Sequence, residues 1–251
     1  MRFAIAGATG TVGHFVVDAA RRRGHEVIRL SRATGQNVET GEGVDAALTG
    51  ADAVIDVTSV GTTSAARSVE FFAAASESLL SAEARQGVAH HIALSIVGID
   101  AVPFGYYAGK LAQERIVTDA VVPHSILRAT QFHEFAGQLL AQTTIGPLAL
   151  VPSGLVRPVA ARDVAEALVT IAEGDPVGRA RDLRGPRDET LLSMARRLLR
   201  AKRAKRAKRL AIGVSLPGDY WRGLRSGVLR GTADSDEGTV TFDEWLPLDA
   251  N

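Results

Sequence analysis

The sequence contains no cysteine among its 251 residues. This absence excludes a disulfide framework, zinc sites with cysteine ligands, iron–sulfur clusters and thiolate nucleophiles. A chain that makes no use of disulfides fits a reducing compartment. We therefore expect the protein in the cytoplasm.

The sequence also lacks an excess of either charge and a long hydrophobic run. Lys plus Arg number 29 against 28 Asp plus Glu, so the net charge is +1. No apolar run reaches the roughly 20 residues of a membrane helix. The chain enters a strand-like segment at its first residues, without the regions of a signal peptide. We expect that the protein binds neither membranes nor nucleic acid. The expected partner is a small-molecule substrate, and an oligomer is possible.

Short apolar runs rich in β-branched residues alternate with longer helical patterns before residue 130. This alternation predicts an α/β fold of the Rossmann type, in which helices cover both faces of a doubly wound parallel sheet. The expected strands are Phe3 to Ala6, Glu26 to Leu30, a weak one near Gln36 to Val38, Ala53 to Val57, His91 to Leu94, and Ser125 to Leu127. The expected helices are Thr11 to Arg23, Val44 to Leu48, Ser64 to Gln86, and Tyr106 to Asp119.

The pattern loosens after residue 130. It predicts a helix over Glu134 to Gln142, strands over Leu148 to Val151 and Val156 to Val159, and a helix over Asp163 to Glu173. No linker rich in Pro, Gly and Ser divides the chain. We therefore expect a single domain over residues 1–251, with a core over about 1–130 and a small C-terminal substrate-binding lobe over about 131–251.

One segment, Ala201 to Arg209, repeats the tripeptide Ala-Lys-Arg. A period of three drifts around a helix of 3.6 residues per turn, so the alanines never form one apolar face. The pattern favours a solvated helix. A clamp for an anionic partner is the alternative.

A glycine-rich loop follows the first expected strand and opens a helix. Its sequence is Gly7-Ala8-Thr9-Gly10-Thr11-Val12-Gly13. Glycines there permit a tight turn and close approach to a pyrophosphate, and the N–H groups of the helix start receive its charge. The residues that we expect to bind a dinucleotide in this loop are Gly7, Thr9, Gly10, Thr11, Val12 and Gly13.

The end of the second expected strand selects between the two nicotinamide dinucleotides. An acidic residue there would accept the ribose hydroxyls, and an arginine would meet a 2′-phosphate. The sequence has Arg29-Leu30-Ser31-Arg32 and no acid. It favours NADPH/NADP over NADH, with Ser31 and Arg32 at the phosphate; two ordinary surface arginines are the alternative.

Tyr106 and Lys110 lie four residues apart on an expected helix, so both side chains project from one face. An ammonium group stabilises a phenolate and makes proton exchange with a carbonyl oxygen feasible. Ser95 ends the strand that precedes this helix, at the edge where ligands of doubly wound sheets bind. Tyr107 competes with Tyr106 as the acid.

The spacing Gly-x-x-Gly-x-x-Gly, together with Ser95 and Tyr-x-x-x-Lys, resembles the short-chain dehydrogenase/reductase superfamily, particularly its extended and atypical members. The resemblance implies that Ser95 positions a carbonyl, Tyr106 transfers the proton, and Lys110 also holds the nicotinamide ribose. Three further stretches, Ala93 to Gly98, Ile126 to Phe132 and Pro158 to Ala165, are similar to NAD(P)H-binding proteins of the NmrA-like type.

This likeness adds further expectations. It places the stretch from Thr130 through Gln131 and Phe132 to His133 near the nicotinamide and substrate, with Thr130 at the cofactor.

Thr58 and Ser59 end the fourth expected strand, where we expect them to line the ribose or pyrophosphate. We interpret Asp163 as a carboxylate at a helix N-terminus. His90 and His91 point to opposite sides of an extended strand, so we expect no metal site.

The residues lead to an NADPH-dependent oxidoreductase that reduces a carbonyl or quinone-like small molecule. An epimerase or dehydratase that uses the dinucleotide transiently is one alternative. A regulatory protein that senses NADPH without turnover is another. The tyrosine and lysine favour catalysis, and the basic run favours the sensor.

Overall fold

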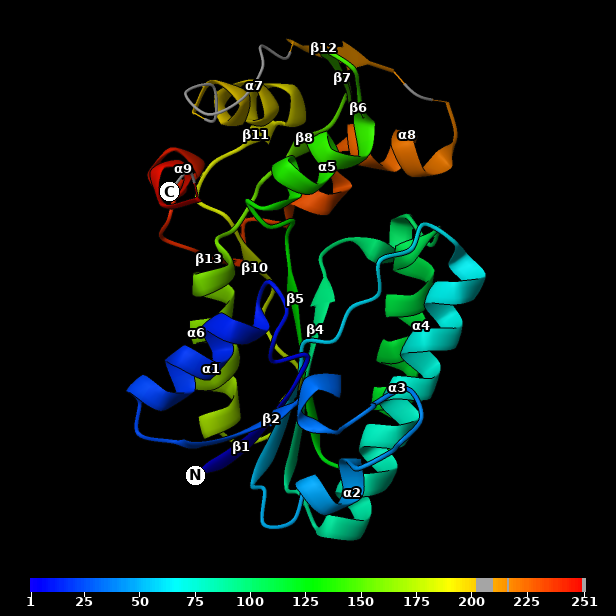
Figure 1. The fold of residues 1–251 in the computed structure, drawn as a ribbon, viewed down its shortest axis with the longest axis vertical. Helices are drawn as coiled ribbons and strands as arrows, with labels where there is room; N and C mark the ends of the chain where they lie inside the picture. Colours follow the sequence, from blue (N-terminus) through cyan, green and yellow to red (C-terminus); the bar gives the residue numbers. More distant parts are fainter. Residues whose placement is uncertain (202–209, 216, 250–251) are drawn as a thin grey trace.

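The structure is a computed structural model that describes residues 1–201, 210–215 and 217–249. An α/β layer contains the N-terminus, and a smaller lobe lies over one edge of its sheet (Figure 1). Most of the basic run, for which a solvated helix is the favoured prediction, lies outside the described ranges, at residues 202–209. In the described part of the chain, no helix combines the length and apolarity needed to cross a membrane.

The main sheet has the order β13-β10-β5-β4-β3-β1-β2, with β9 also beside β5, and its pairs are parallel. Its strands are β1 (Arg2–Ala6), β2 (Glu26–Leu30), β3 (Ala53–Asp56), β4 (His90–Ile96), β5 (His124–Ala129), β9 (Gly178–Arg179), β10 (Leu183–Arg184) and β13 (Asp236–Glu237). The predicted doubly wound parallel sheet is confirmed.

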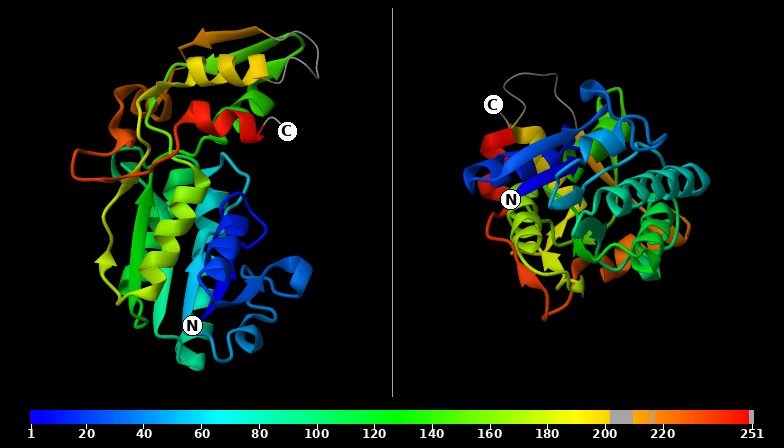
Figure 2. Two further views of the ribbon diagram at one scale, coloured as in Figure 1. Left: turned by 90° about the vertical axis from the view of Figure 1, so that its left-hand side faces the viewer. Right: turned by 90° about the horizontal axis from the view of Figure 1, so that it is seen from below.

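Helices cover both faces of this sheet (Figure 2). One face carries α1 (Gly13–Arg22) and α6 (Ala161–Glu173). The other carries α2 (Val44–Ala47), α3 (Ala65–Gln86) and α4 (Tyr106–Asp119). Because α1 leaves β1 on one face and α3 leaves β3 on the other, the chain diverges at the carboxyl ends of these neighbouring strands. Such a divergence opens the crevice in which α/β proteins bind ligands.

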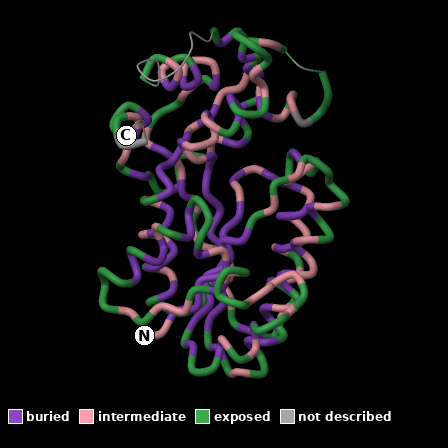
Figure 3. Tube along the Cα trace, in the orientation of Figure 1, coloured by how far each residue is buried: buried purple, intermediate pink, exposed green. Residues whose placement is uncertain are grey.

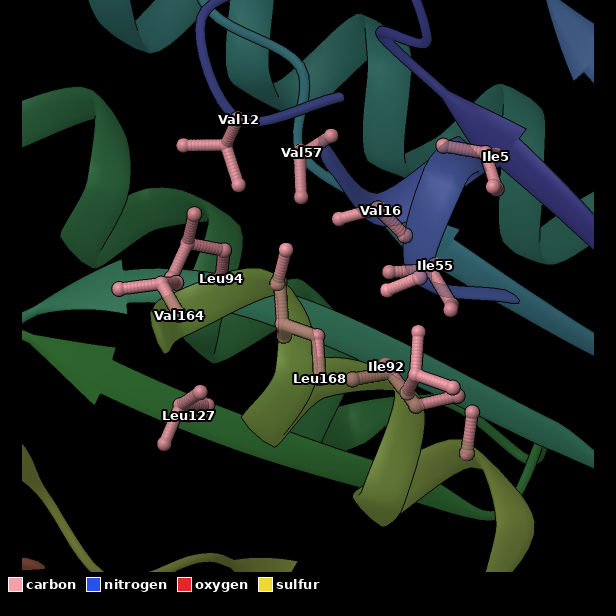
Figure 4. Close-up of a cluster of buried hydrophobic side chains, with 14 of the residues drawn as sticks. Ile5, Val12, Val16, Ile55, Val57, Ile92, Leu94, Leu127, Val164 and Leu168 are labelled. Atoms are coloured by element: carbon pink, nitrogen blue, oxygen red, sulfur yellow. The ribbon is translucent and has the colours of Figure 1, made fainter. Parts of the chain in front are cut away.

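A large apolar cluster forms the core beneath α1 and α6. Figure 4 shows side chains from the strands and from both helices meeting there. The labelled members are Ile5, Val12, Val16, Ile55, Val57, Ile92, Leu94, Leu127, Val164 and Leu168. Arg23 also joins the two helices, through Glu166 at 2.7 Å and Glu173 at 2.8 Å. Burial is therefore concentrated on the strands between the helix layers (Figure 3).

The lobe has a second apolar core and two small sheets, β11-β8 and β12-β7-β6. Its elements are α5 (Phe135–Thr143), β6 (Thr144–Ile145), β7 (Leu148–Pro152), β8 (Leu155–Val156), β11 (Glu189–Thr190), α7 (Leu191–Ala201), β12 (Leu210–Val214), α8 (Asp219–Ser226) and α9 (Phe242–Asp249). The chain returns from the lobe to the main sheet as β13 and is tied to α6, because Asp163 accepts hydrogen bonds from the backbone N–H groups of Thr239 and Val240.

Two expected strands differ from the structure. The weak strand near Gln36 to Val38 is wrong: Asn37 makes only an isolated bridge to Glu42, inside a tight turn. The strand expected over Val156 to Val159 ends at Val156, and Val159 makes an isolated bridge to Phe132. Pro158 between them has no N–H to donate to a ladder.

Candidate active site

The glycine-rich loop is built so tightly that two of its glycines exclude any side chain. Gly7 has a φ of +82°, and a Cβ there would lie 2.8 Å from the carbonyl oxygen of Val57. A Cβ on Gly13 would lie 2.0 Å from the Gly7 oxygen. The Gly10 N–H donates to the same oxygen at 2.9 Å. The loop therefore keeps a bare backbone at the end of β1.

Helix α1 begins at Gly13 without a side-chain cap and without an acidic residue in its first turn. Thr9, Gly10 and Thr11 are exposed, whereas the Val12 side chain is buried in the apolar core. Val12 can therefore contribute only its backbone to a ligand. Uncapped N–H groups at a helix start attract an anion through both hydrogen bonding and the helix dipole.

Ser31 and Arg32 follow β2 beside this loop, since Ala6 pairs with Leu30 in the register. The Ser31 hydroxyl is joined to the Thr34 hydroxyl at 2.9 Å, within a short 3₁₀ helix over Arg32–Thr34. Arg32 is exposed and forms no ion pair with any residue that the structure describes. Its guanidinium is thus free to meet an anion at this edge, whereas the Ser31 hydroxyl already has a protein partner.

Tyr106 opens α4 and points to the end of β3. Its hydroxyl forms a hydrogen bond of 2.9 Å with Ser59, and its ring meets Phe72 edge to face with centroids 5.5 Å apart. Burial raises the pKa of Tyr106 to about 12, partly offset by the Ser59 bond. Tyr107, in contrast, is buried in the lobe core beside Ile99 and Val102. The structure thus brings Tyr106 to the sheet edge and packs Tyr107 into the core.

Lys110 lies one turn beyond Tyr106 on α4 and is almost completely buried. Its ammonium donates to Oε1 of Gln113 and lies 4.5 Å from the centroid of the Phe72 ring. Burial lowers the pKa of Lys110 to about 8, and the carboxylates of Asp56 and Glu114 act in the opposite direction. Tyr106 and Lys110 therefore flank the same aromatic ring.

Asp56 and Gln113 belong to this site and were missed in the sequence. Nε2 of Gln113 donates to Oδ2 of Asp56 at 2.7 Å, and the backbone N–H of Thr58 donates to Oδ1 at 2.8 Å. Neither Asp56 nor Gln113 exposes any surface. An acid at the end of an otherwise apolar strand and an amide three residues after Lys110 were the available signals.

Ser95 and Thr58 carry buried hydroxyls without a partner among the described residues. Ala93 packs against α3 and α4 through Leu80 and Val117, and Ser95, two residues further along β4, projects to the same face. Thr58 follows β3 beside it, because Asp56 pairs with Ala93 in the register. Both hydroxyls are available to a ligand at the carboxyl edge.

The residues from Thr130 to His133 lie in different environments. The Thr130 hydroxyl donates to the Arg157 carbonyl at 2.6 Å and accepts from the Gly185 N–H at 3.3 Å, so backbone groups occupy it. Gln131 is buried, and its amide has no partner in the described ranges. His133 is enclosed by Phe242 and Trp245 in the lobe, with Nε2 2.9 Å from the Val240 carbonyl, and burial lowers its pKa.

The other histidines and Asp163 have structural partners. His90 contacts Ser125 at 2.8 Å, and His91 contacts Glu83 of α3 at 2.8 Å, which confirms that the two rings point to opposite sides. Burial lowers the pKa of His91, but the Glu83 carboxylate outweighs it and raises the pKa overall. Asp163 lies in the first turn of α6, as expected. No group of three metal-ligating side chains is found within the described ranges.

A comparison with protein families matches residues 3–95 to the NAD dependent epimerase/dehydratase family. This segment contains the glycine-rich loop, β3 and β4 up to Ser95. This match supports the predicted resemblance to the short-chain dehydrogenase/reductase superfamily over the first part of the chain. The narrower likeness to NmrA-like proteins stays a prediction. No protein of curated function matches the sequence.

Solved structures share the fold over nearly the whole chain. An NADPH-dependent quinone oxidoreductase from Escherichia coli, complexed with NADPH, is 19% identical, with a TM-score of 0.74 and coverage of 99% of this chain and 100% of that one. A short-chain dehydrogenase/reductase superfamily protein from Agrobacterium tumefaciens with bound NAD is 17% identical (TM-score 0.72, coverage 100% and 96%). A triphenylmethane reductase from Citrobacter sp. is 16% identical (TM-score 0.73, coverage 100% and 99%). At these identities the likeness shows the fold.

Proposed function

We propose that this protein is an NADPH-dependent oxidoreductase that reduces a carbonyl or quinone-like small molecule. The observation that carries the proposal is the placement of the Tyr106 hydroxyl at the carboxyl end of β3, bonded to Ser59, with the Lys110 ammonium one helical turn away. A phenol with a pKa of about 12 holds its proton at neutral pH and can give it to a developing alkoxide.

The residues at this edge fit a nicotinamide dinucleotide. The tight turn at Gly7 and Gly13 leaves a bare backbone at the end of β1, and the uncapped start of α1 supplies N–H donors that a pyrophosphate would accept. Arg32 would meet a 2′-phosphate, which favours NADPH over NADH. The solved relatives bind NADPH in one case and NAD in another, which supports this class of cofactor. When bound, the cofactor supplies a hydride.

The chain's own side chains would orient the substrate and move the proton. Ser95 has a buried hydroxyl without a described partner, so it can donate a hydrogen bond to the substrate oxygen. Tyr106 would donate the proton to the same oxygen. Lys110 would hold the ribose hydroxyls and stabilise the phenolate left on Tyr106. The buried surroundings would strengthen these contacts by excluding water.

Epimerase or dehydratase chemistry is the second candidate, because the family that matches residues 3–95 has that description. In such a reaction the dinucleotide is regenerated in each cycle. The matched segment covers the glycine-rich loop but ends before Tyr106 and the lobe. It therefore bears on cofactor binding more strongly than on the reaction.

The deciding experiment measures NADPH oxidation by the purified protein with a panel of aldehydes, ketones, quinones and imines. Stoichiometric NADPH consumption with one class of acceptor is the expected result. Tight NADPH binding without consumption by any acceptor would contradict the proposal and favour a sensor. Conversion of a sugar nucleotide without net change in NADPH would favour the epimerase instead.

A further inference from the structure

Asp56 is linked to both Lys110 and Tyr106 through separate oxygens, in each case by way of another residue. Oδ2 accepts from Gln113, whose other amide atom accepts from the Lys110 ammonium. Oδ1 accepts a hydrogen bond from the backbone N–H of Thr58. The next residue, Ser59, is hydrogen-bonded to the Tyr106 hydroxyl. One carboxylate on β3 thus connects to both reactive side chains on α4.

The polarity of this chain of hydrogen bonds is fixed. The Lys110 ammonium has only donors, so Gln113 must present its carbonyl oxygen to it. The amide nitrogen must then donate, and only an acceptor can face it. Since both Asp56 oxygens receive N–H groups, the ionised carboxylate satisfies every member. Reversing the amide would place donor against donor at Lys110.

Among the charged groups around Lys110, Asp56 is the one without a charged partner of its own in the described part of the chain. Lys110 faces the Phe72 ring from α3, Glu114 and Tyr106 on its own helix, Asp56 on β3, and the paired His91 of β4. Glu114 is bonded to Arg128 at 2.7 Å, and His91 is paired with Glu83. Each nearby charge other than Asp56 therefore already has a partner. In a buried environment an ammonium without a nearby anion is costly.

We propose that Asp56 and Gln113 are positioning residues that fix where the Lys110 ammonium and the Tyr106 hydroxyl stand relative to one another. The proposal rests on the oxidoreductase function proposed above. Asp56 acts on Lys110 through Gln113, and on Tyr106 through the loop that carries Thr58 and Ser59. Neither residue touches a substrate.

The sharpest test exchanges the two functional groups. Asp56→Asn leaves an amide N–H facing either the Gln113 N–H or the Thr58 N–H. Gln113→Glu places a carboxylate against Asp56. The double variant satisfies every position again, because the amide now on β3 accepts from Thr58 and donates to the new carboxylate on α4, which accepts from Lys110. It also keeps the net charge. Ser76→Ala is the matched control, since Ser76 is buried on α3 and its hydroxyl has no described partner.

We expect each single variant to lower kcat by about tenfold or more and the double variant to recover to within about threefold of the parent. Ser76→Ala should not change kcat. If Asp56→Asn does not fold, Gln113→Ala decides, because it breaks the same connection and leaves Asp56 intact. A double variant as impaired as the worse single variant, or an Asp56→Asn protein that is less stable but has the parent's kcat, would overturn the proposal.

A second measurement needs neither cofactor nor substrate. The sequence has four lysines, and Lys110 is the only one outside the Ala-Lys-Arg repeat. NMR of lysine labelled at Cε, with the Lys110 signal assigned by Lys110→Met, reports its titration directly. We expect Asp56→Asn to shift the Lys110 midpoint to lower pH and the double variant to bring it back. An unchanged midpoint in Asp56→Asn would contradict the inference, whereas a parent that oxidises no NADPH contradicts only the proposed function.

Discussion

The two faces of the central sheet differ in what they bury. The side chains beneath α1 and α6 form a large apolar cluster, with one buried polar pair, His90 and Ser125, on the same side of the strands. The face beneath α3 and α4 encloses charged and polar groups as well. They are Asp56, Ser68, Ser76, Glu83, His91, Ser95, Lys110 and Gln113. Apolar packing and the candidate chemistry are thus divided between opposite sides of one layer of strands.

This difference indicates that one face contributes mainly to stability and the other to the proposed activity. Apolar burial contributes stability without demanding exact partners, whereas every buried polar group costs free energy unless it is hydrogen-bonded. On the α3 and α4 face most polar groups have partners. Of the buried hydroxyls that lack one among the described residues, those of Thr58 and Ser95 lie at the carboxyl edge, and that of Ser76 lies within α3. Substitutions on the two faces should therefore separate stability from activity.

The largest effect on stability is expected on the apolar face. Leu168 is fully buried on α6, so Leu168→Ala removes packed methyl groups and leaves a cavity. It should lower the free energy of unfolding by about 3 kcal/mol. Denaturant unfolding measures this loss, and Val121→Ala, at a site that is 89% exposed, is the control. Under conditions where Leu168→Ala is fully folded, its NADPH affinity should equal that of the parent. A lower affinity would contradict the separation of stability and activity between the two faces.

The matching effect on chemistry is expected at Tyr106. Tyr106→Phe keeps the ring and its contact with Phe72 but removes the hydroxyl, so NADPH should still bind while turnover falls by about 10²-fold. Lys110→Met should weaken both binding and turnover. Tyr107→Phe is the control and should be the milder change. Steady-state kinetics and NADPH titration measure these effects, and turnover that survives Tyr106→Phe but collapses in Tyr107→Phe would reassign the acid.

NADPH affinity and the preference for NADPH over NADH should depend on Arg32. Arg32→Asp replaces an exposed cation beside the expected 2′-phosphate by an anion. NADPH affinity should therefore fall by at least about tenfold, and the preference for NADPH over NADH should narrow or reverse. Titrations with both cofactors measure it. Arg29→Asp on the exposed edge of β2 should have a smaller effect. Equal affinity of the parent for both cofactors would contradict the assignment.

The buried ammonium should make cofactor binding depend on pH. Burial lowers the pKa of Lys110 to about 8, so its charge is present below that pH and is lost as the pH rises through it. NADPH affinity should therefore decrease by about threefold to tenfold between about pH 7 and pH 9. Binding isotherms across this range give the profile, and Lys110→Met should flatten it. A parent with constant affinity would remove Lys110 from the ribose contact.

The smallest effect is expected from the basic run. Replacing Lys202, Arg203, Lys205, Arg206, Lys208 and Arg209 together by Gln should leave NADPH affinity and turnover nearly unchanged at ordinary salt, because solvated charges are screened beyond about 10 Å. The same assays measure it. Loss of turnover would show that the run takes part in the reaction.

The features that could be predicted from the sequence are those encoded in short segments. The glycine-rich loop, the pair on α4 and the alternation of strands and helices each occupy one stretch, and helix α4 was predicted at Tyr106 to Asp119 as observed. The bond between Asp56 and Gln113 joins residues 57 positions apart and leaves no periodic trace. Likewise, two-residue strands of the lobe such as β8 and β11 depend on distant pairing and not on local preference.

The position of β13 has a consequence for biosynthesis. This strand extends the main sheet at β10, and the residues after it are bound by Asp163, so residues far along the chain from β1 complete the same layer. A ribosome synthesises these residues after those of β10 and of the lobe elements α7, β12 and α8. Until then the outer edge at β10 remains unpaired, and an unpaired parallel edge is prone to aggregation. The nascent protein would depend most on chaperones in the interval between the synthesis of β10 and that of β13.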